Sequence, residues 1–152
     1  MFKTHLVFSL FLGLILVNFL NIQNNKLLFI VVILLFSVFP DIDYRRSTVG
    51  RRFGIISWII NLLFRHRGVF HSIYFPLLFF LIFYYLNLKL IAFAALIGYL
   101  SHLFLDMMTY AGIKLFHPLH KFQIKGFLRS GGFLEFILFL AFLMADVYLI
   151  VI

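Results

Sequence analysis

The chain has 152 residues, of which 64% are hydrophobic and only 12% are charged. With a mean hydropathy of +1.12, it has too little polar surface to cover a water-soluble globule, which indicates an integral membrane protein. Cysteine is absent, so disulfides, thiolate metal ligands and a cysteine nucleophile are excluded.

Four apolar stretches meet or nearly meet the roughly 20 residues that a helix needs to cross a bilayer. In chain order they are 5–22, 69–88, 90–111 and 133–152. The stretch 27–39 is shorter and stops at Pro40, but it could span with help from 40–43 if that acidic end lies in a wet, protein-lined cavity. The run 53–64 is too short to cross and is flanked by arginines, so we predict an interfacial or re-entrant helix there.

The whole chain, 1–152, reads as a single integral membrane domain without an internal repeat or linker. No small-residue cleavage site follows the first apolar stretch, so we expect it to be a retained span and not a signal peptide. The predicted fold is an all-α, polytopic membrane helix bundle of about five transmembrane helices plus one short interfacial or re-entrant helix.

Positive charge is distributed unequally. If the N-terminus and the 40–68 and 112–132 loops share one side, that side carries all but Lys26 and Lys89 of the 13 lysines and arginines. We call it the basic side, and the positive-inside rule predicts that it is cytoplasmic. Membrane orientation and anionic headgroups explain the net charge of +8, so we expect membrane lipid and no nucleic acid as a partner.

Ionisable side chains gather in the half of the membrane next to the basic side. Such groups cost several kcal/mol within a membrane unless they are paired, solvated or bound to a metal. The eight groups are His5, Asp41, Asp43, His66, His71, His102, Asp106 and Glu135. Random placement would scatter them over both halves, so together they indicate a metal site built from nitrogen and oxygen ligands.

Individually, these groups have structural alternatives. His102 and Asp106 stand four residues apart and so share one helix face, where they could bind an ion or form a structural pair. Asp41 and Asp43 could cap the next segment or pair with arginines, although two such close carboxylates repel unless a cation neutralises them. Taken alone, Glu135 near the membrane boundary could contact headgroups.

The segment from His66 to Ser72 places two imidazoles around Gly68 at a junction between loop and helix. Such a turn can aim His66 and His71 at one point. The planar guanidinium of Arg67 matches the oxygens of a phosphate, but Arg67 could equally serve as a positive-inside anchor.

Other polar groups lie outside this set. We expect His117 and His120, in the basic 112–132 loop, to be solvated or to contact headgroups. Asp146 lies toward the opposite end of the last stretch, where we expect it to face another helix or the aqueous boundary. Thr109 shares the helix face of His102 and could donate a hydrogen bond to a ligand.

Three motifs follow one another in the chain. They are Pro40-Asp41-Ile42-Asp43, His66-Arg67-Gly68 with His71-Ser72, and Gly98-Tyr99-Leu100-Ser101-His102 with Asp106, Thr109 and Gly112. In order and spacing they resemble the YdjM-like family of inner-membrane proteins, inferred to be metal-dependent hydrolases, and the early His5 and late Glu135 also fit. The resemblance implies a polytopic inner-membrane protein with a metal-hydrolase site. The ligand order is also distantly similar to that of zinc-dependent phospholipase C.

Eight nitrogen and oxygen ligands exceed what one tetrahedral zinc uses, so we predict two or more divalent ions, zinc first, with manganese or iron as alternatives. The predicted metal ligands are His5, Asp41, His66, His71, His102 and Asp106, and the predicted catalytic residues are Asp43, Glu135 and Arg67. The predicted function is hydrolysis of a lipid or membrane-associated phosphoester from the cytoplasmic face. An ion or proton transporter is the main alternative, and a purely structural membrane protein is the third.

Overall fold

The computed structural model describes residues 1–151 except 46 and 65–67. In this part of the chain the regular elements are all helical, which confirms the predicted all-α class, and the only β-type pairings are two isolated bridges. The elements are α1 (Phe2–Phe19), α2 (Lys26–Val38), η1 (Phe39–Asp43), α3 (Thr48–Phe64), η2 (Val69–His71), α4 (Tyr74–Tyr85), α5 (Lys89–Met107) and α6 (Phe133–Val151).

Among the described residues, three helices, α1, α5 and α6, are long and apolar enough to cross a membrane by themselves. The segments Lys26–Asp43 and Thr48–Leu62 form a pair bent by 54°, which is a fourth candidate if the pair counts as one broken span. Helix α4 is apolar but has only 12 residues. Of the predicted spans, 69–88 is therefore shorter as a helix than hydropathy indicated, whereas α2 and η1 together cover 27–43.

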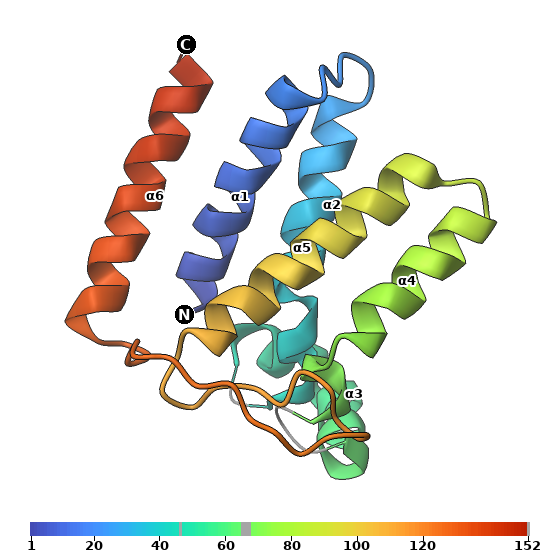
Figure 1. The fold of residues 1–152 in the computed structure, drawn as a ribbon, viewed down its shortest axis with the longest axis vertical. Helices are drawn as coiled ribbons and strands as arrows, with labels where there is room; N and C mark the ends of the chain where they lie inside the picture. Colours follow the sequence, from blue (N-terminus) through green and yellow to red (C-terminus); the bar gives the residue numbers. More distant parts are fainter. Residues whose placement is uncertain (46, 65–67, 152) are drawn as a thin grey trace.

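The helices lie side by side, and the connecting segments gather at two ends (Figure 1). The N-terminus, α3 and the 108–132 segment lie at one end, whereas the C-terminus and the turns between α1 and α2 and between α4 and α5 lie at the other. The segments grouped as the basic side in the sequence thus lie at one end of the molecule.

Helix α5 lies at the centre of the bundle and packs against α1, α2 and α4. Its contact with α2 is close because Gly98 lies against the backbone of Ile33: a Cβ added at Gly98 would stand 2.3 Å from the Ile33 carbonyl oxygen. Small residues allow helix backbones to approach in this way. One turn further along each helix, the same contact brings Ser37 next to His102.

Helix α3 begins at Thr48, earlier than the predicted 53–64, and its backbone is kinked at Gly54, where φ is 44°. The hydroxyl of Ser47 accepts a hydrogen bond from the backbone N–H of Gly50 at 2.7 Å, which caps the first turn. Large apolar side chains of α3 stay exposed, among them Ile55, Trp58 and Leu62. This exposure suits a helix that lies along a membrane surface.

Candidate metal centre

His102 is held by the end of α2. Its Nδ1 lies 2.7 Å from the backbone oxygen of Ser37. Because a carbonyl only accepts, Nδ1 carries the proton, and Nε2 faces the cluster with its lone pair. Pro40 has no N–H to donate back to Ser37 in the tight turn of η1, so His102 supplies a donor to that carbonyl.

His71 is oriented in the same way from the other side. Its Nδ1 lies 3.1 Å from Oδ2 of Asp43, and its Nε2 lies 3.3 Å from Nε2 of His102. If both Nδ1 atoms donate outward, two lone pairs face each other at this distance. A proton or a cation between them resolves the conflict.

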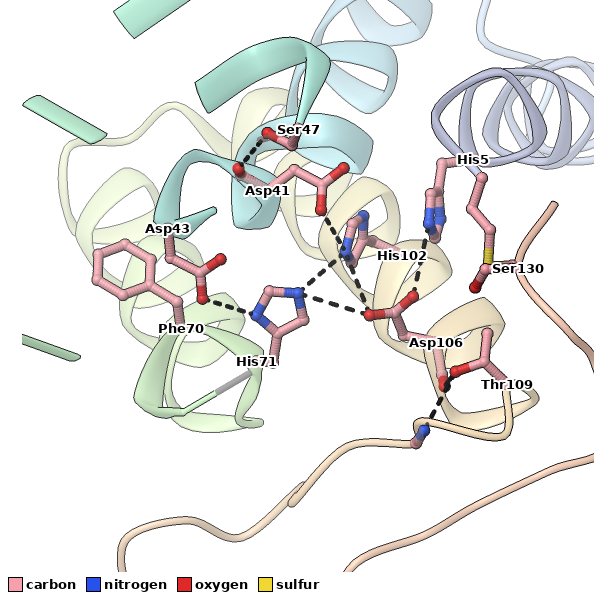
Figure 2. Close-up of polar contacts among 12 residues, drawn as sticks. His5, Asp41, Asp43, Ser47, Phe70, His71, His102, Asp106, Thr109 and Ser130 are labelled. Carbon is pink, nitrogen blue, oxygen red and sulfur yellow. Dashed lines mark hydrogen bonds and ion pairs between the residues drawn. The ribbon is translucent and has the colours of Figure 1, made fainter. Parts of the chain in front are cut away.

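Asp106 joins the remaining histidine to this pair. Its Oδ2 lies 3.6 Å from Nε2 of His71 and 3.9 Å from Nε2 of His102, while its Oδ1 lies 3.6 Å from Nε2 of His5. Its two oxygens therefore face different histidines, as Figure 2 shows. The fifth member, Asp41, has Oδ1 at 4.0 Å from Nε2 of His102.

These five side chains form two overlapping groups with ligand atoms within 4.8 Å of one another, His5–His102–Asp106 and Asp41–His71–His102. Two ligands on one tetrahedral zinc, at roughly 2.0–2.1 Å from it, lie about 3.3 Å apart. The closest separation, between the two Nε2 atoms, is at that value, and the other ligand atoms of each group lie within 4.8 Å. The donor set and its spacing therefore fit one or two divalent ions.

The centre is buried but reachable. Asp43, His71 and His102 are fully buried, and His5 and Asp106 nearly so. A cleft of about 510 Å³ leads to it at the basic end and is lined by His5, Asp41 and Asp106 among others. A small polar group can thus approach from that end without crossing the membrane.

The electrostatics at His71 are set by its neighbours. Burial alone would lower the pKa of His71, but the hydrogen bond and charge of Asp43, with the charges of Asp106 and Asp41, raise it above its ordinary value. Without a cation, His71 therefore tends to keep a proton at the place where the two Nε2 atoms meet.

Comparison with known proteins supports the membrane assignment. A family model described as YdjM inner membrane protein matches residues 1–151. The chain belongs to the YdjM family. The uncharacterized protein YvsG of Bacillus subtilis is 34% identical over 114 residues, which is 74% of this chain and 71% of that protein.

The inner membrane protein YdjM of Escherichia coli is 40% identical over 86 residues, and so is its Shigella flexneri counterpart. That region is 52% of this chain but only 43% of each of those proteins. No solved structure matches the chain significantly. Membership of the YdjM family confirms the resemblance carried by the motifs and supports a membrane localisation, and the names of these relatives state no reaction.

The other predicted site residues of this YdjM-family protein divide into two sets. His66 and Arg67 lie outside the described residues. Glu135, at the start of α6, does not belong to either ligand group. Its Oε1 accepts a hydrogen bond from Thr4 at 2.6 Å and its Oε2 accepts one from the backbone of Gly131, so it ties α6 to the start of α1.

The residues predicted to lie outside the cluster differ in their surroundings. His120 is exposed, as expected, whereas His117 is half-buried and its Nδ1 atom is buried without a hydrogen-bond partner among the described residues. Asp146 is buried, and its carboxylate oxygens have no hydrogen-bond partner in the described part of the chain. The hydroxyl of Thr109 donates to the backbone carbonyl of Asp106 at 2.8 Å, so it fixes the turn that ends α5.

Sequence reasoning missed the carbonyl of Ser37. Residue type does not show which backbone carbonyl accepts a hydrogen bond from a side chain. The one local indication is Pro40, which has no backbone N–H to donate to the Ser37 carbonyl.

Proposed function

We propose that this protein is a membrane-bound metal-dependent hydrolase that acts on a lipid or membrane-associated phosphoester from the cytoplasmic face. The observation that carries the proposal is the pair of Nε2 atoms of His71 and His102, which face each other at 3.3 Å beside Asp106 in a buried cluster. Such an arrangement is costly without a positive charge at its centre.

The residues that would hold the ions are His5, Asp41, His71, His102 and Asp106. The share of imidazole favours zinc, with manganese or iron as alternatives. A carboxylate whose oxygens face different histidines suits a bridge between two ions, which supports Asp106 in that role. His66 stays a further ligand on the strength of the sequence motif.

A divalent ion at this place would supply acidity to water and neutralise phosphoryl oxygens. In the hydrolysis, the oxygen of water forms a bond to phosphorus, the bond from phosphorus to the leaving oxygen breaks, and a proton of the water ends on that oxygen. Asp43 acts through His71 as a positioning residue that fixes its tautomer and ring direction. Arg67 keeps its proposed contact with the phosphate, which the sequence motif supports.

Anionic lipid suits the basic end as a partner. A pocket of about 540 Å³ is lined there by Arg45 and by residues of α3, among them Arg51 and Trp58. Guanidinium groups bind phosphate and aromatic rings lie well at the membrane interface. Together with the exposed apolar side chains of α3, this pocket supports a headgroup held next to the cleft.

The confinement of the cluster favours hydrolysis over transport. A conduit needs polar groups along the whole thickness of the membrane. Among the described residues, Asp146 is the one buried ionisable group toward the opposite end. Ion or proton transport therefore stays the alternative that the experiment must exclude.

The proposal is tested first by metal content. In purified protein, His102→Ala should lower bound metal at least ~10-fold, since even loss of a residue that orients a ligand costs about 10–100-fold in metal affinity. His120→Ala, which alters an exposed histidine, should leave it unchanged. Equal metal content in the two variants would remove the metal site from the proposal.

Hydrolysis is tested next, with phosphatidic acid and an isoprenoid phosphate in detergent and in bilayers. Turnover should stop with a chelator and return with zinc or manganese. Asp106→Asn keeps the size but removes the charge, so it should lower turnover more than ~100-fold in a protein that still inserts. Metal-loaded protein that releases nothing from lipid phosphoesters, esters and amides, yet moves protons or divalent ions across sealed vesicles, would favour the transporter.

A further inference from the structure

A second cavity of about 470 Å³ lies beside the cleft that leads to the metal cluster. Its lining includes Phe2 and Thr48, which also line that cleft. The remainder is contributed by the starts of α1 and α6, including Phe136 and Phe139. The two hollows are therefore neighbours that share part of one wall.

Their linings differ in character. The cleft carries ionisable side chains of the cluster, His5, Asp41 and Asp106. The second cavity has one wall of phenylalanine rings, those of Phe2, Phe136 and Phe139, and polar groups at its rim. The one carboxylate at this rim, that of Glu135, already accepts hydrogen bonds from Thr4 and Gly131 and pairs with the N-terminal amine of Met1. The second cavity is thus a groove with an apolar aromatic wall and a paired polar rim, and we call it the α1/α6 groove.

The α1/α6 groove lies between the starts of two helices that can each span a membrane. Helix α6 packs mainly against α1 and stands at the edge of the bundle (Figure 1). Both helices are long and apolar enough to span a membrane, and α6 exposes Leu134, Ile137 and Leu140. An apolar hollow between two such helices offers a chain in the bilayer a lateral way in.

We propose that the α1/α6 groove holds a hydrocarbon chain of the lipid whose phosphoester lies at the metal cluster. The inference rests on the proposed function, because it takes the cluster as the place of the phosphoester. A lipid whose headgroup enters a polar cleft must keep its chain out of water. The shared wall formed by Phe2 and Thr48 lets one molecule occupy both hollows, so the preferred substrate is a long-chain phosphoester and not a soluble phosphate.

Photolabelling tests this assignment. The full-length protein is placed in phosphatidylcholine vesicles that contain phosphatidic acid with a diazirine on one acyl chain, and the labelled peptides are identified by mass spectrometry. Label should appear on the first two turns of α6, and an excess of unlabelled phosphatidic acid should reduce it. Phe139→Trp narrows the groove and should lower this competable labelling about fivefold.

Two further variants keep the test decisive. Leu140→Trp adds the same ring at the next position, outside the groove lining, and should leave the competable labelling unchanged. Phe136→Trp alters a half-exposed groove residue and should act like Phe139→Trp even if that variant inserts poorly. The assignment of the groove would be overturned if excess unlabelled lipid did not reduce the labelling. It would also be overturned if the labelling fell as much in Leu140→Trp as in Phe139→Trp.

The metal-site variant separates this result from the hydrolase itself. Labelling should persist in His102→Ala, because the groove does not include the cluster. Competable labelling without hydrolysis in the wild type would support the groove and count against the hydrolase. A further comparison uses the KM for long-chain dioleoyl and short-chain dibutyryl phosphatidic acid. If Phe139→Trp changed both KM values equally, the hydrolase would be supported and the assignment of the groove overturned.

Discussion

At each of the two central histidines, Nδ1 forms a hydrogen bond with a neighbouring group and Nε2 faces the cluster. His102 is fixed by the carbonyl of Ser37 and His71 by the carboxylate of Asp43. The partners differ in charge, because a carbonyl is neutral and a carboxylate is not. His71 is consequently the histidine whose proton is held more firmly when no metal is bound.

This difference predicts an unusual dependence of stability on pH. The pKa of His71 is raised in the folded protein, so protonated His71 stabilises the metal-free protein below the unfolded pKa of about 6.5, and this contribution is lost as the pH rises through the raised value. In chelator, the melting temperature should therefore fall as the pH rises above about 6.5. With zinc the trend should reverse, because the metal needs the unprotonated imidazole.

Asp43→Asn provides the comparison. It should flatten the pH dependence in chelator and destabilise the protein by roughly 1–3 kcal/mol at low pH, where it removes a hydrogen bond between charged groups. His120→Ala should keep the wild-type slope. Thermal unfolding in detergent measures both, and parallel slopes for wild type and Asp43→Asn would contradict the assignment to His71.

The sequence predicts a site residue well when its position on a helix fixes the direction of its side chain. The pair His102 and Asp106 follows from spacing on one face of α5. Glu135 was placed in the site because it lies at the right depth, but depth does not say toward which neighbour a side chain points. Its contacts with Thr4 and Gly131 depend on how α6 is rotated against α1, which composition leaves open.

At the level of elements, the centre depends on how closely α2 approaches α5. Gly98 on α5 and Ile33 on α2 are in contact, and one turn later on each helix His102 forms its hydrogen bond with Ser37. A larger distance between the helices at Gly98 would therefore also separate His102 from Ser37. The distance between two backbones is therefore part of the ligand geometry.

Gly98→Ala tests this dependence. The added Cβ would meet the backbone of Ile33 at 2.3 Å, and overpacking of this kind costs about 1–3 kcal/mol. We expect a lower melting temperature and reduced metal content. In Gly13→Ala, the new Cβ would meet side chains and no backbone, those of Ile33 at 3.4 Å and Ile30 at 3.7 Å, so this control should stay close to wild type. Similar losses in both would show that the approach of α2 to α5 does not set the centre.

The ends of the helices were harder to foresee than their existence. The predicted stretch 69–88 contains only the 12 residues of α4 as a regular helix, because η2 and a turn use its first residues to bury His71. The stretch 90–111 ends as a helix at Met107. Thr109 and Gly112 form the following turn, and Gly112 has a φ of 57° that suits glycine. Hydropathy does not distinguish apolar residues in a helix from apolar residues in a buried turn.

For the whole molecule, the grouping of charged segments at one end predicts the orientation. Asn24 and Lys121 are both exposed and lie in segments at opposite ends, and a chain without cysteine allows clean labelling. Lys121→Cys should react with an impermeant thiol reagent only after the membrane is permeabilised, because the positive-inside rule predicts that the basic end faces the cytoplasm. Asn24→Cys should react in intact cells, and the reverse pattern would invert the orientation.

Both candidate ligand groups contain His102, which has a consequence for how the protein is made. While only α1 to α4 have left the ribosome, His5, Asp41 and His71 have no common centre. Water at the membrane surface must keep these polar groups solvated until α5 inserts between its neighbours. Under the proposed metal binding, uptake of the ion would be a late event of biogenesis, and a nascent chain stalled before α5 would carry unburied polar groups that quality-control proteases can recognise.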